Sequence, residues 1–128
     1  MSVEEQIYTR LSGLAGLAAL VDDRIYPKIL EQNCTLPAIT YQRVSSERIS
    51  AMGVDTDIVR ARFQISAWAE TYTEMVAVAE QIRLALQRYR ITTGTKIDDC
   101  FMLPEVDLFE EEIRTFQRAM DFEIIYRE

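Results

Sequence analysis

The sequence contains no histidine, and its 128 residues include only two cysteines, four glycines and three prolines. Without histidine the chain cannot build a Ser-His-Asp triad or a histidine-ligated zinc site, and it lacks the commonest general base at neutral pH. The few, scattered glycines exclude a glycine-rich phosphate-binding loop, and together with the few prolines they exclude a low-complexity or collagen-like chain. These absences argue against an enzyme.

The two cysteines, Cys34 and Cys100, are too few for a four-thiolate metal site and have no histidine to activate them as nucleophiles. The N-terminus opens with acidic residues and lacks the basic start and apolar run of a signal peptide. The longest apolar stretch, residues 14–21, is far too short to cross a bilayer. We therefore expect two free thiols, a reducing compartment and no membrane partner.

Acidic residues outnumber basic ones by 21 to 14, which gives a net charge of −7. Sequence-specific binding of nucleic acid, which needs clustered lysine and arginine, is therefore not expected, and neither is attraction to an anionic membrane. The acidic runs at residues 98–99 and 110–112 lack the spacing and the turn glycine of a calcium-binding loop. We expect solvated acidic surfaces there, and we predict no catalytic residue, no metal site and no cofactor.

Hydrophobic residues make up 48% of the chain and charged residues 27%, as in an ordinary soluble globular protein. A chain of this length can bury roughly two-thirds of its unfolded surface, which is enough for one core. We therefore expect residues 1–128 to form a single domain.

Two segments have the pattern of helices. Ser2 with Glu5, and Thr71 with Glu74, are capping boxes that mark helix starts. Apolar residues then recur at spacings of three and four, which predicts one helix from residue 3 to residue 21 and a second ending near Arg90. The apolar stripes are Val3, Ile7, Leu11, Leu14, Ala18 and Val21 in the first helix, and Met75, Ala79, Ile82, Leu86 and Tyr89 in the second.

Four segments have the pattern of strands. Residues 59–68 and 116–126 alternate between apolar and polar residues, so that one set of side chains faces a core and the other set faces away from it. Residues 38–45 form a less regular strand, and Pro104 interrupts residues 97–108, which predicts a bulged or edge strand. Between these elements we expect a short extended piece at residues 24–27, a polar loop at 45–57, a turn at 92–95 and an acidic connector at 109–112.

The predicted element order is helix, strand, strand, helix, strand, strand. This order favours an α+β fold of two layers, in which two helices pack on one face of a mainly antiparallel four-stranded sheet.

The face of this sheet away from the helices carries charges of opposite sign on two strands. One interpretation is that these charges only pair with each other across neighbouring strands. The other is that this face, with its tryptophan and the polar loop, docks another chain, because arginine and tryptophan are enriched at interfaces. The candidate interface residues are Arg60, Arg62, Gln64, Trp68, Glu47, Arg48, Met52, Asp121 and Glu123.

Several stretches resemble the tail completion proteins of long-tailed bacteriophages and prophages, also called tail terminator or tail-to-head joining proteins. The matching stretches are RIYP at residues 24–27, LPAITYQ at 36–42, FQISAWAETY at 63–72 and RAMDFEIIY at 118–126. The acidic run at 110–112 and the segment 45–57 have no counterpart that can be matched residue by residue. The similarity extends over essentially the whole chain through the order and spacing of these stretches.

The resemblance implies a structural protein without an active site. It would assemble in the bacterial cytoplasm and lie in the virion, where it caps the head-proximal end of the tail tube as a ring, typically of six copies. The implied partners are further copies of this chain, the tail tube protein and a head completion or connector protein.

Two other functions remain open from the sequence alone. One is a head completion or connector protein on the head side of the same junction. The other is a host-encoded α+β oligomerisation module with no role in a phage, which a gene neighbourhood without phage morphogenesis genes would favour.

Overall fold

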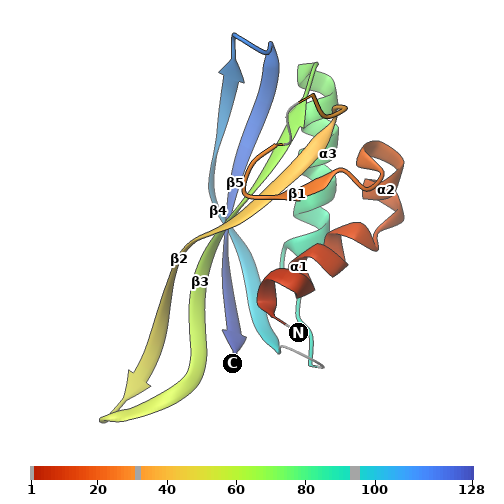
Figure 1. Ribbon diagram of the computed structural model, residues 1–128. Helices are drawn as coiled ribbons and strands as arrows, with labels where there is room; N and C mark the ends of the chain where they lie inside the picture. Colours follow the sequence, from red (N-terminus) through yellow and green to blue (C-terminus); the bar gives the residue numbers. More distant parts are fainter. Residues whose placement is uncertain (1, 31–32, 93–95) are drawn as a thin grey trace.

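The computed structural model describes residues 2–30, 33–92 and 96–128. In that part of the chain three helices and five strands follow one another, and Figure 1 shows the helices gathered on one side of a long, twisted sheet. The elements are α1 (Val3–Ser12), α2 (Ala15–Val21), β1 (Ile25–Pro27), β2 (Ala38–Ala51), β3 (Val54–Ala69), α3 (Tyr72–Leu86), β4 (Ile97–Glu110) and β5 (Thr115–Arg127).

The expectation of two helices on a four-stranded, mainly antiparallel sheet is wrong. Over the described residues the sheet has five strands in the order β1-β2-β3-β5-β4. The short strand β1 pairs in parallel with β2, whereas the other three pairings are antiparallel. The sheet is therefore mixed, and β1 was predicted only as an extended piece because three residues carry no periodic signal.

The single helix predicted over residues 3–21 is two helices. Gly13 ends α1 and donates its N–H to the carbonyl oxygen of Thr9, and Leu14 then adopts an extended conformation before α2 begins. Apolar spacing alone does not register such a break, because two consecutive helices can present their apolar residues to the same core. The low helix propensity of Gly13 was the available signal.

The predicted polar loop at residues 45–57 is instead a β-hairpin. Strand β2 continues to Ala51 and β3 begins at Val54, so that only Met52 and Gly53 form the turn. Both turn residues have positive φ, +52° and +79°, as two-residue hairpin turns of type I′ require. Figure 1 shows this hairpin extending at the lower left beyond the helices. Its strands have no alternating pattern because most side chains on both faces are exposed.

The second half of the chain follows its pattern more closely. β4 lies at the edge of the sheet and shifts register between Met102 and Glu105, which confirms the bulged edge strand predicted from Pro104. The acidic connector at 109–112 is in part strand, because β4 continues to Glu110. α3 ends at Leu86, four residues before the predicted end. The turn predicted at 92–95 falls on residues 93–95, which lie outside the described residues.

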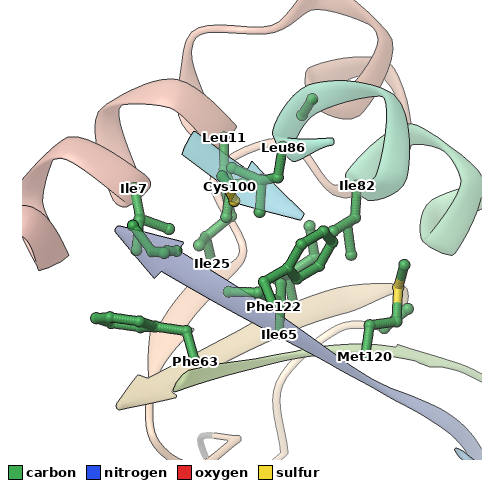
Figure 2. Close-up of a cluster of buried hydrophobic side chains, with 14 of the residues drawn as sticks. Ile7, Leu11, Ile25, Phe63, Ile65, Ile82, Leu86, Cys100, Met120 and Phe122 are labelled. Carbon is green, nitrogen blue, oxygen red and sulfur yellow. The ribbon is translucent and has the colours of Figure 1, made fainter. Parts of the chain in front are cut away.

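The core lies between the helices and one face of the sheet. Ile65 from β3, Phe122 from β5 and Ile82 from α3 are fully buried and lie close together, as Figure 2 shows, and Phe63 from β3 is also fully buried. Burying one side chain of this size contributes about 1.5–3 kcal/mol of transfer free energy. The alternation predicted for β3 and β5 is confirmed, because the apolar set faces these helices.

Both predicted capping residues start helices. The Ser2 hydroxyl accepts the N–H of Glu5, and the Thr71 hydroxyl accepts the N–H of Glu74, each at 3.2 Å. Each such cap contributes about 1 kcal/mol to helix stability. They fix where α1 and α3 begin, and thereby which of their faces meets the sheet.

The two cysteines form no disulfide, as the sequence predicts. Cys100 belongs to the core, and its burial raises the pKa of its thiol to about 12, so that little nucleophilic thiolate forms at neutral pH. Among the described helices, none has the length and apolar character needed to cross a lipid bilayer.

Candidate assembly surfaces

The open face of the sheet is the face of β2, β3, β5 and β4 that lies away from the helices. Directly opposed residues of paired strands point to the same side, so that the strand register assigns each side chain to a face. On this face Glu47 lies opposite Arg60, and Arg62 lies opposite Glu123. The open face is therefore charged where the helix-facing side of the same strands is apolar.

The charges of the open face pair across β3 and β5. Arg62 donates from Nε to Asp121 Oδ2 at 2.9 Å and forms a second, shorter contact from Nη2, while Arg60 Nε lies 3.4 Å from Glu123 Oε1. The cross-strand pairing predicted from the sequence is confirmed. Because the arginine side chains are half exposed, each pair contributes only about 0.2–1 kcal/mol.

An open depression of about 350 Å³ lies between these charges. It spans β2 to β4, and its lining residues are Ser45, Ser46, Glu47, Arg60, Arg62, Leu103 and Glu123. Four of the nine candidate interface residues therefore share one surface, and Gln64 joins them through Asp121, since its Nε2 lies 3.4 Å from Asp121 Oδ1.

The remaining three candidates lie elsewhere. Trp68 is near the other end of β3, and its indole N–H donates to Thr40 Oγ1 at 2.9 Å, so that the ring is half-buried. Arg48 faces the helix side and pairs with Glu128 at 2.6 Å. Met52 lies at the hairpin turn. The structure thus separates the nine residues into one charged cluster, one anchored tryptophan and one exposed tip.

The β2–β3 arm, residues 44–58, is the hairpin that projects beyond the helices. Met52 at its tip is fully exposed, and Val44 at its base is half exposed. Two register shifts bend the arm, one between Arg43 and Ser45 and one between Arg48 and Ser50. An arm of this kind has little core of its own and offers both faces to a neighbour.

The β4–β5 arm, residues 105–115, projects at the opposite end of the sheet, as Figure 1 shows. The sequence predicted a solvated acidic segment here but did not indicate this arm as a candidate interaction surface. Its exposed side chains combine apolar and acidic groups: Val106, Leu108, Phe109, Glu110, Glu111, Glu112 and Ile113. The signal for this surface in the sequence was the run of apolar residues interspersed with acidic residues along a predicted edge strand.

Aromatic and charged contacts fix the base of the β4–β5 arm. Phe116 contacts the rings of Phe109 and Tyr72, with centroid separations of 4.8 and 5.9 Å. Arg118 Nε donates to Asp107 Oδ1 at 2.7 Å, and the Tyr72 hydroxyl donates to Asp107 Oδ2 at 3.0 Å. The hydrogen bond from Arg118 lowers the pKa of Asp107, with a smaller lowering from Tyr72. The arm is therefore attached to the first turn of α3.

The described chain therefore presents a charged sheet face with internally paired charges and two exposed hairpins. Residues 5–127 match the family described as tail completion protein gp17, and the chain belongs to this family. The resemblance noted in the sequence is confirmed. The chain is therefore a structural tail completion protein, located in the tail or at the head–tail junction of a virion.

A structural comparison supports the fold. The chain is similar to a chain from the virion of a native gene transfer agent (GTA) particle, with a TM-score of 0.76 and 17% sequence identity. The similarity covers 95% of this chain and 92% of that chain. A sequence comparison with curated proteins finds no match.

Proposed function

We propose that residues 1–128 form a single domain that caps the head-proximal end of the tail tube as a ring of six copies, ends tube growth and joins the tail to the head. Its partners in this role are further copies of itself, the tail tube protein and a head completion or connector protein. It performs this role without catalysis, cofactor or metal.

The observation that carries this proposal is the β2–β3 arm. An isolated two-stranded hairpin is marginally stable in water, because it has no apolar face to bury. In this arm residues 44–48 and 50–53 are exposed, and the tip from Ser50 to Asp55 extends beyond the pairing of β3 with β5, which begins at Ile58. A partner surface would supply the burial that the monomer does not, and a ring that contacts a tube below and a head above offers such surfaces.

Shortening the arm tests the proposal. Replacing residues 49–58 by Asn-Gly, which favours a two-residue hairpin turn between the paired residues Arg48 and Val59, removes the tip and leaves the core residues unchanged. In particles that lack the gene, this variant should restore at least tenfold fewer joined virions than the natural chain, counted by electron microscopy. The matched control is Glu80→Ala on the exposed side of α3, whose carboxylate pairs with Arg83.

The outcomes separate the alternatives. The shortened variant must keep the circular dichroism spectrum and cooperative melting of the natural chain, so that a joining defect is assigned to the arm. Full restoration of joined virions by that variant would contradict the role of the arm. Tails of normal length beside unfinished or leaking heads, in the absence of the gene, would favour the head completion function instead.

A further inference from the structure

The outer edge of β2 is covered only near its start. β1 pairs with residues 39–41 of β2, from Ile25 opposite Ile39 to Pro27 opposite Tyr41. Among the described residues, no strand pairs with residues 42–51 on that side. The backbone N–H and C=O groups along this open half of β2 are available to another strand.

The outer edge of β4 is also only partly covered, by the chain that follows α3. Arg88 donates its backbone N–H to the carbonyl oxygen of Cys100 at 2.6 Å, and Ile91 and Ile97 exchange two backbone hydrogen bonds. The backbone N–H of Met102 donates to the side chain of Gln87 at 2.9 Å. In the described part of the chain, no such contact covers residues 103–110, which form the open half of β4.

The two open halves lie at diagonally opposite ends of the sheet. The register places Ser46 beside Ala61, Ile124 and Cys100, at the level where β4 is covered. It places Val106 beside Ala119 at the level where β2 is covered by β1. At each level of the sheet, one outer edge is covered by the chain's own backbone while the other is uncovered. This arrangement limits the length of edge strand that can pair with another molecule.

The strand directions allow the two open halves to meet between copies. β2 and β4 run antiparallel to each other, because three antiparallel pairings separate them in the sheet. A neighbouring copy in the same orientation would bring its β2 antiparallel to β4 of the first copy. Matching the open halves requires an offset of roughly five to six residues, or roughly 18 Å along the strands.

This offset is compatible with a closed ring. Four long strands per copy occupy roughly 19 Å across the sheet. If each copy is shifted by roughly 18 Å along the strands relative to its neighbour, the strands tilt by roughly 43° from the ring axis. Strands of closed barrels tilt by roughly 35–45°. Identical contacts repeated at this tilt would close by rotation rather than extend indefinitely.

The charges of the two open halves are complementary. Residues 42–51 carry two arginines and one glutamate, whereas residues 103–110 carry three acidic residues and no basic one. Arg48 is largely exposed, and Glu105 and Glu110 are exposed. Opposite charges across neighbouring strands are stabilising, whereas like charges are destabilising, so that β2 against β4 is favoured over β4 against β4.

We propose that the open half of β4 in one copy pairs antiparallel with the open half of β2 in the next copy, and that this contact repeats around the ring. The proposal rests on the proposed ring function and names the segments through which the ring closes. The occupant of each edge is therefore a second copy of this chain.

Cysteine cross-linking in assembled particles tests this pairing. In a Cys34→Ser background, Val106→Cys is combined in turn with Ser45→Cys and with Glu47→Cys, which all lie on the open face. Because every copy carries both cysteines, oxidation of one of these variants should give a ladder of linked copies on a non-reducing gel. Val106→Cys combined with Thr9→Cys, on the exposed side of α1, is the matched control and should remain monomeric.

A failure of the pairing and a failure of the proposed function give different results. Joined virions that contain the variant copies but show no ladder with either pair would overturn the pairing and leave the joining function intact. Loss of the natural gene without any joining defect would overturn the function, whatever the cross-links show. A ladder of equal intensity in the Thr9 control would also overturn the pairing, because it would reveal unspecific collision.

Charge exchange gives an independent check of the same contact. Arg48→Glu places an acid against the acidic half of β4 and should reduce joined virions, whereas adding Glu105→Arg, at a position that like Arg48 faces the helix side, should restore them at least partly. The absence of any rescue, with both variants folded, would contradict a contact between these two segments. The Arg48→Glu defect should deepen at low salt, since screening of the repulsion is weaker there.

Discussion

The two faces of β3 and β5 are built from alternating residues of the same strands, yet their side chains differ in polarity and in the interactions they make. On the helix side Phe63 and Phe122 are fully buried, and their removal would leave a cavity. On the open side half-exposed Arg62 pairs with Asp121, whose side chain is largely buried. The apolar face therefore supplies the burial that stabilises the fold, whereas the opposite face carries charged pairs in which the arginine is half exposed.

The largest expected effect is on the helix side. Phe122→Ala should lower the free energy of unfolding by about 3–5 kcal/mol, because it removes a buried ring from the centre of the core. Urea denaturation followed by circular dichroism measures this loss. Glu123→Ala, one residue further along β5, is the matched control and should cost less than about 1 kcal/mol. Equal losses for the two variants would contradict the difference between the faces.

An intermediate effect is expected at Trp68, where the open face is not uniformly exposed. Trp68→Phe removes the indole N–H that donates to Thr40, a residue only 5% exposed, while keeping an aromatic ring. The expected loss is about 0.5–1.5 kcal/mol in the same denaturation experiment. A loss as large as that of Phe122→Ala would show that this end of the open face is core.

A smaller effect is expected within the charged cluster. Arg62→Ala should lower the free energy of unfolding by about 0.2–1 kcal/mol, and a double-mutant cycle with Asp121→Ala isolates the energy of the pair. The coupling should shrink when salt is raised, because Arg62 is half exposed. A salt-independent coupling would contradict the assignment of this pair to a solvated surface.

The smallest effect is a pH dependence at the base of the β4–β5 arm. The pKa of Asp107 is lowered by the hydrogen bond from Arg118, so that its contribution to stability is present above the unfolded pKa, about 4, and is lost as pH falls through the folded pKa. Asp107→Asn should flatten the stability profile on the acid side slightly. An unchanged acid limb, with wild-type stability at pH 7, would show that the carboxylate is not coupled to folding.

The sequence predicted those elements in which one face is covered. β3 and β5 alternate with period two because only one of their faces meets the helices. The opposite charges at Arg62 and Asp121 were expected to pair if these strands are neighbours, which they are. The capping residues Ser2 and Thr71 predicted two helix starts for a local reason, since a cap bonds only to its own first turn.

The sequence did not predict segments whose structure depends on contacts with residues far away in the chain. It also did not predict strands whose side chains are exposed on both faces. The β2–β3 arm was read as a loop because its side chains are exposed on both faces, which removes the alternating pattern. The helix break at Gly13 was hidden by a continuous apolar stripe. The cover of β4 by residues 87–91 depends on where the end of α3 meets the sheet, which no local pattern encodes.

The most direct test of the account is the distribution of tail lengths in a lysate whose phage or prophage lacks this gene, measured by electron microscopy. A chain that caps the tail tube predicts free heads beside unjoined tails, many of them longer than normal, and restoration of joined virions by the natural gene. Normal joined virions in the absence of the gene would contradict the account.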